Sequence, residues 1–164
     1  MREQLFRANQ ANSPGSSLTA HGMRQNFRPL LLSGETVMTA RLDAYFLLIA
    51  ILYIVAGIGL GIGMGIAEDF TYMHLHAHMN LVGFVMHGFF GFAHRLWPGL
   101  SRSALAKPQF LMFTIGAPIF LVGLPVAQFH GQPILAIIGS LLVFAASILF
   151  LIMFAAKIRN PAAA

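Results

Sequence analysis

The sequence contains no cysteine and little charge. The absence of cysteine excludes a disulfide framework, an iron–sulfur cluster, covalently attached c-type haem and thiolate zinc sites. Only 9% of the 164 residues are charged, whereas about a quarter of an average soluble chain is charged. Because 57% of the residues are hydrophobic, a domain of this size cannot cover its apolar surface with polar groups. Most of the chain is therefore predicted to lie in lipid.

Common catalytic patterns are also missing from the sequence. It has no glycine-rich phosphate loop, no arrangement of nucleophile and base, and no paired carboxylates inside its apolar segments. These absences argue against independent hydrolytic catalysis.

Four apolar segments follow a polar stretch over residues 1–37, which has no helical or strand period and is expected to be a disordered cytoplasmic tail. Each segment is close to the ~20 residues that cross ~30 Å of hydrocarbon as a helix. Segments of that length with little alternation do not suit barrel strands. The prediction is an all-α integral membrane bundle of four transmembrane helices within residues 38–164. The segments cover about 44–67, 72–97, 110–128 and 134–156.

The ten basic residues predict the orientation of these segments. Five precede the first segment, three lie at the connection between the second and third, and two follow the fourth. The other two connections have none, and the first of them carries Glu68 and Asp69. Four spans place all the basic residues on one side, which the positive-inside rule makes cytoplasmic. We therefore expect both termini in the cytoplasm of a cell with a bacterial-type inner membrane. This orientation explains the net charge of +5, so a nucleic-acid partner is not expected.

Histidines are concentrated on the second segment. An ionisable side chain within a span is costly and marks a candidate functional site. At 3.6 residues per turn, His74 and His78 lie one turn apart, while His76, His87 and His94 share a different face within roughly 20°. The topology brings four histidines to the non-cytoplasmic end and leaves His87 near mid-membrane. Those four are His74, His76, His78 and His130.

The histidine pattern is open to more than one interpretation. Imidazole ligates iron, copper and zinc, so His74 and His78 are candidates for a metal site completed by His130 or Met73. The alternative is a structural role, in which each ring hydrogen-bonds to Asn80, a serine or a backbone carbonyl.

Glycines recur in the first segment. Gly57, Gly61 and Gly65 are four residues apart and form a small-residue stripe that permits close helix approach. Packing within the chain is favoured over a dimer interface as the reason for this stripe.

The run His76-Ala77-His78-Met79-Asn80, continued through an aromatic-rich stretch to Trp97-Pro98, resembles the second transmembrane helix of the haem–copper oxidase catalytic subunit. The similarity covers about residues 39–98 and is greatest to the nitric-oxide-reductase-like branch. This resemblance to a cytochrome-c oxidase subunit I-like protein implies that His78 is an axial ligand of haem b near the non-cytoplasmic surface. The family's copper ligands and second haem ligand lie on later helices, and the third and fourth segments here contain no histidine. The resemblance therefore does not imply a complete oxidase.

The expected function is a membrane protein that binds haem b through His78 and serves electron transfer or gas sensing. His74, His76, His87 and His130 are further candidates for cofactor binding, and His130, Met64 or a histidine of another subunit is expected as the second axial ligand. The alternative is a copper-binding or accessory subunit of a respiratory complex, and a third reading is a purely structural membrane subunit. The expected partners are the lipid bilayer and either a second copy of the chain or respiratory-complex subunits.

Overall fold

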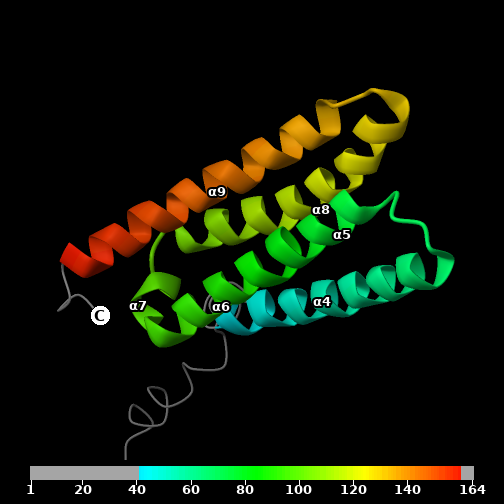
Figure 1. The fold of residues 1–164 in the computed structure, drawn as a ribbon. Coiled ribbons are helices and arrows are strands. Elements are labelled where there is room, and N and C mark those ends of the chain that lie inside the picture. Colours follow the sequence, from blue (N-terminus) through cyan, green and yellow to red (C-terminus); the bar gives the residue numbers. More distant parts are fainter. Residues whose placement is uncertain (1–40, 160–164) are drawn as a thin grey trace, which may run out of the picture. The chain divides into compact units, whose positions relative to one another are not determined.

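The computed structural model describes residues 41–159, and all regular structure in this range is helical. The all-α prediction is confirmed for this part of the chain, while the predicted tail over residues 1–37 lies outside the described residues. Figure 1 shows the order of the elements. They are α4 (Leu42–Ala67), α5 (Met73–His78), the π-helical η2 (Met79–Met86), α6 (His87–Leu96), α7 (Pro98–Ser101), α8 (Ala106–His130) and α9 (Ile134–Arg159).

Three helices are long and apolar enough to cross a membrane. These are α4, α8 and α9, with 26, 25 and 26 residues and mean hydropathies of 2.5, 2.1 and 2.8. At 1.5 Å per residue, each is longer than the ~30 Å of a hydrocarbon core. They contain the predicted segments 44–67, 110–128 and 134–156, and α8 continues through Pro118 and Pro125. The chain thus has the character of a multi-pass membrane protein.

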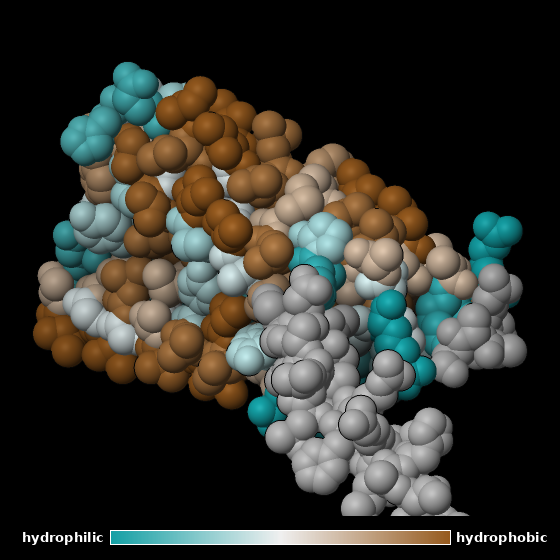
Figure 2. All heavy atoms as spheres, turned by 180° about the vertical axis from the view of Figure 1, so that it is seen from behind, coloured by the Kyte–Doolittle hydropathy of each residue, from teal (hydrophilic) through white to brown (hydrophobic). Residues whose placement is uncertain are grey.

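The surface of these helices is apolar, as lipid contact requires. Many of the large hydrophobic side chains are exposed, including Leu52, Ile62 and Phe144. Figure 2 shows apolar residues over much of the face seen from behind, with the most hydrophilic residues towards the two ends. Side chains of this kind would be costly to expose to water in such number.

The predicted segment 72–97 is helical from Met73 to Leu96, but its middle part, Met79–Met86, is π-helical. A π-helix closes i→i+5 hydrogen bonds, so its turns hold more residues than α-helical turns. The segment is thus helical as predicted, but the turn of 3.6 residues used to place its histidines does not hold through Met79–Met86.

Glycines allow the helices to pack closely in two pairs. One pair is α8 with α9, and the other is α4 with the η2–α6 part of the second segment (Figure 1). A Cβ atom at Gly123 would overlap the Ala136 backbone, and one at Gly139 would overlap the Phe120 backbone. Small residues of this kind permit the van der Waals packing that holds helices together in lipid.

The core lies towards the α7 end of the bundle, and five of the eleven buried residues in its cluster are phenylalanines. The Phe46 and Phe110 rings meet edge to face at 4.8 Å, as do Phe90 and Phe113 at 4.8 Å. Phe150 of α9 contacts Phe90 at 4.6 Å. Aromatic pairs in such geometries add about 0.5–1.5 kcal/mol each beyond the area they bury. This cluster joins α4, α6, α8 and α9.

The connection between α4 and α5 is fixed by local hydrogen bonds. Helix α4 ends at Ala67, and the next residue, Glu68, caps it with a left-handed φ of 52°. The Thr71 hydroxyl and the Thr71 backbone N–H both donate to the Asp69 carboxylate, and these bonds lower the pKa of Asp69. The Gln128 side chain donates to the Thr71 carbonyl at 3.1 Å, which ties this loop to the end of α8.

The packing predicts which glycines tolerate a methyl group. Gly123→Ala and Gly139→Ala should each destabilise the protein by about 1–3 kcal/mol, because the added carbon meets facing backbone that cannot rotate away. Gly59→Ala is the matched control, since nothing lies within 4 Å of its Cβ position. Thermal unfolding in detergent measures the effect, and equal melting temperatures for all three variants would contradict the backbone contact.

Candidate functional site

The histidines of the second segment lie on two faces. His76 bonds to α4, and the rings of His87 and His94 lie 6.0 Å and 5.6 Å from the Phe46 ring of α4. The His78 ring instead contacts Phe120 of α8 at 5.3 Å. The two faces expected from residue spacing are therefore found in the structure. The π-helical η2 lies between His78 and His87 and changes the number of residues per turn there.

His76 has both ring nitrogens engaged. Nδ1 lies 2.9 Å from the Gly57 carbonyl of α4, and because a carbonyl only accepts, Nδ1 is the donor. Nε2 then accepts from the Asn80 amide at 3.1 Å. A Cβ at Gly61 would lie only 2.8 Å from the ring. His76 thus has no lone pair free for a metal, and it joins two helices instead of binding a cofactor. The structural alternative, with Asn80 as partner, describes this residue.

His87 is fully buried between α4 and α8. Its Nδ1 donates to the Val82 carbonyl at 3.2 Å, within the wider turns of η2. The ring lies 5.4 Å from Tyr53 and 4.7 Å from Phe113. Its Nε2 is buried without a hydrogen-bond partner among residues 41–159. Because the side chain has no exposed surface, this nitrogen is not accessible to a cofactor in the present packing.

His94 and Gln109 form a buried polar group near the α7 end. His94 Nδ1 is 3.0 Å from the Ser101 hydroxyl, and its ring stacks on Phe46. The Gln109 side chain lies beside His94 and is fully buried. The sequence analysis did not select Gln109. An amide side chain inside an apolar helix is costly in lipid, so its presence there could have marked Gln109 as a candidate functional residue. At the same end, Arg95 pairs with Asp43 at 3.1 Å, an exposed ion pair that contributes little to stability.

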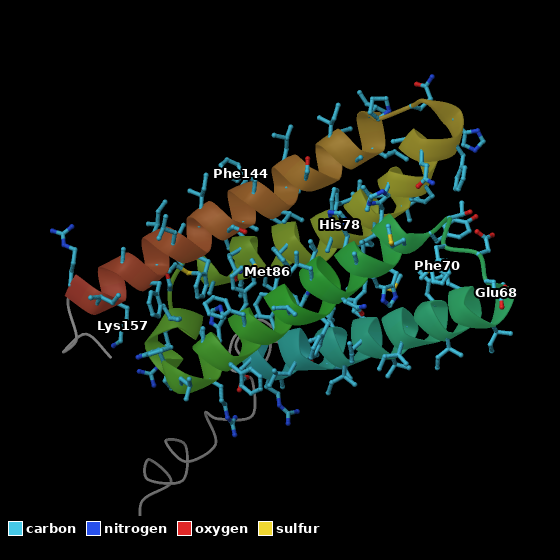
Figure 3. The ribbon with its side chains drawn as sticks, viewed as in Figure 1. Glu68, Phe70, His78, Met86, Phe144 and Lys157 are labelled. Atoms are coloured by element: carbon cyan, nitrogen blue, oxygen red, sulfur yellow. The ribbon has the colours of Figure 1, made fainter. Side chains whose placement is uncertain are left out.

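His78 has the geometry of a metal ligand. Its Nδ1 donates to the His74 carbonyl at 2.8 Å, one turn earlier on the same helix. This bond places the proton on Nδ1 and leaves the Nε2 lone pair free, the arrangement that metal-binding histidines generally adopt. The ring is half-buried and meets Phe120 edge to face, and Figure 3 shows it between α5 and α8.

The remaining candidates are not gathered around His78. His74 is exposed and contributes its backbone carbonyl, while His130 is exposed at the end of α8. Met64 is buried in α4. Within residues 41–159, no three or more histidine, aspartate or glutamate side chains form a group that could hold a metal ion. The predicted copper or zinc set of His74, His78 and His130 is thus not assembled in this part of the chain, although the three residues belong to the same end of the bundle.

Comparison with known proteins leaves the family open. No family model, curated protein or solved structure matches this chain. The resemblance of the second segment to an oxidase helix therefore stays a prediction from its sequence.

The His76–Asn80 contact gives a quantitative prediction. Replacing Asn80 with alanine leaves His76 Nε2 without its donor, and hydrogen bonds of this kind in membrane helices average about 0.6 kcal/mol, with a maximum near 1.7 kcal/mol. A double-mutant cycle of Asn80→Ala and His76→Ala, read by unfolding in mixed micelles, should give a coupling energy in that range. Gln128→Ala combined with His76→Ala is the control, and its effects should add.

Proposed function

We propose that this chain is a four-span membrane protein, with both termini in the cytoplasm, that binds haem b through His78. Beyond α4, α8 and α9, the continuous helical run from Met73 to Leu96 supplies the fourth span. At 1.5 Å per residue, its length suffices to cross the hydrocarbon.

Contacts between helix ends support this arrangement. At one end, Arg95 pairs with Asp43 and Trp97 packs on Phe154 at 5.1 Å, so the start of α4 and the ends of α6 and α9 lie together. At the other end, Tyr72 packs on Phe129 at 5.5 Å. The described basic residues belong to the first end, which the positive-inside rule assigns to the cytoplasm.

The observation that carries the haem proposal is the anchored imidazole of His78. Among the histidines that bond to the protein through Nδ1, His76 has its other nitrogen engaged, and His87 and His94 are enclosed by aromatic rings. His78 alone in this group keeps Nε2 both unbonded and partly accessible. A proximal histidine binds haem iron through this nitrogen.

The chain's own residues give the site its properties. The His74 carbonyl fixes the orientation of the His78 ring and increases the basicity of Nε2. Phe120 limits rotation of the ring and provides an apolar wall. Bound haem would supply one-electron transfer or gas binding. If His78 alone held the haem, the protein would be suited to binding a gas, whereas a second protein ligand would make it a low-spin electron carrier.

Spectroscopy of variants tests the ligand assignment. The purified protein, supplied with haem, should show the sharp reduced α-band of a b-type haem if two ligands bind, or a broad high-spin spectrum if His78 binds alone. His78→Ala should abolish the specific spectrum, whereas His76→Ala should keep it because both His76 nitrogens bond within the protein. A colourless wild-type protein, or a His78→Ala protein with an unchanged spectrum, refutes the proposal.

The topology can be tested independently, because the sequence has no cysteine to give background labelling. Glu68→Cys, Ala104→Cys and Gln132→Cys each place one thiol at an exposed loop position. A membrane-impermeant maleimide should label positions 68 and 132 in intact cells and position 104 only after permeabilisation. If positions 68 and 104 react from the same side, the segment between them does not span.

A further inference from the structure

A hollow lies where α6, α7 and α9 meet. It has a volume of about 380 Å³ and apolar walls except for one lysine. A second hollow, of about 260 Å³, is also lined by that lysine. The residues that line the first include Leu96, Trp97, Pro98, Phe154, Lys157 and Ile158.

The lysine is Lys157, and its ammonium group is buried without a hydrogen-bond partner among residues 41–159. An ammonium has three donors, and removing it from water without a compensating anion is costly. In the described part of the chain, Asp43 already pairs with Arg95, while Glu68 and Asp69 belong to the loop after α4. Residues 41–159 therefore offer Lys157 no carboxylate, and an anion from outside would satisfy it.

The surroundings of Lys157 are those of a membrane surface. Helix α9 ends at Arg159, two residues later, and Figure 3 shows Lys157 at this end of the helix. Trp97, whose ring packs on Phe154 at 5.1 Å, is 41% exposed, and Ile158 is 66% exposed. Tryptophan is enriched at the level of lipid headgroups. Basic pockets between transmembrane helices at this level bind anionic headgroups.

We propose that this hollow binds an anionic glycerophospholipid. Its phosphate pairs with the Lys157 ammonium, and its glycerol and upper acyl chain lie against Trp97, Phe154 and Ile158. The apolar walls favour a lipid over free phosphate, which would gain nothing from them. This site is separate from the haem proposal and requires only that α6 and α9 end at the membrane surface.

Trp97 makes the site directly observable because it is the only tryptophan in the sequence. The full chain is reconstituted in phosphatidylcholine vesicles, and quenching of Trp97 fluorescence is measured with brominated phosphatidylglycerol or brominated phosphatidylcholine. One basic residue near the surface contributes about 1 kcal/mol, so the wild type should prefer the anionic lipid by about five-fold. Lys157→Gln should reduce this preference to near unity, and Lys157→Arg should retain most of it.

Arg159→Gln is the matched control, because it removes the same charge from the same helix end but Arg159 does not line the hollow. It should keep the preference. Equal quenching by the two lipids in the wild type overturns the proposal, whatever the variants do. A preference that survives Lys157→Gln, or that falls equally in Arg159→Gln, also overturns it in favour of diffuse surface charge. Displacement of the brominated anionic lipid by inorganic phosphate would identify free phosphate as the occupant and refute the lipid.

Discussion

Polar groups inside a bilayer have to find partners within the protein, because hydrocarbon offers none. The second helical segment contains most of the histidines that need such partners, since it holds five of the seven in the sequence. His76, His78 and His87 all satisfy their Nδ1–H in one way, by donating it to a backbone carbonyl, although the Nε2 of His87 has no partner among the described residues. A carbonyl has two lone pairs, so it can accept a ring N–H without losing its helical bond. The carbonyl chosen by each ring then decides its role.

The carbonyl that each ring bonds separates the histidines that stabilise the fold from the one that is suited to bind a cofactor. His76 reaches across to Gly57 on α4, and only a glycine there leaves room for the Asn80 side chain that completes the contact. His87 turns back to its own helix and fills the aromatic core. His78 also turns back to its own helix, but near the end of the segment, where its second nitrogen is not enclosed.

Composition was sufficient to predict the helical class and the long apolar helices, because burial in lipid demands about 20 apolar residues in a row. Spacing also placed His76 and His78 on different faces. It could not indicate which atoms each ring bonds, so it ranked His76 and His87 beside His78. The sequence showed an amide, Gln109, inside an apolar segment, but its full burial beside His94 depends on residues far away in the chain. The π-helical turns of η2 were likewise not visible in the spacing of apolar residues. The stripe of Gly57, Gly61 and Gly65 was correctly attributed to packing within the chain at its first two positions, while Gly65 faces open space.

The two helix pairs differ in what lies at their interfaces. Between α8 and α9, Gly123 and Gly139 bring backbone against backbone. This contact can change only if one helix moves as a whole against the other. Between α4 and the second segment, the facing atoms at Gly57, Gly61 and Gly83 belong to side chains, namely Asn80, His76 and Tyr53. Side chains change rotamer at little cost, whereas backbones do not. A change of helix spacing is therefore resisted by backbone at the α8–α9 interface, whereas at the interface of α4 with the second segment it would first require the His76 and Asn80 side chains to repack.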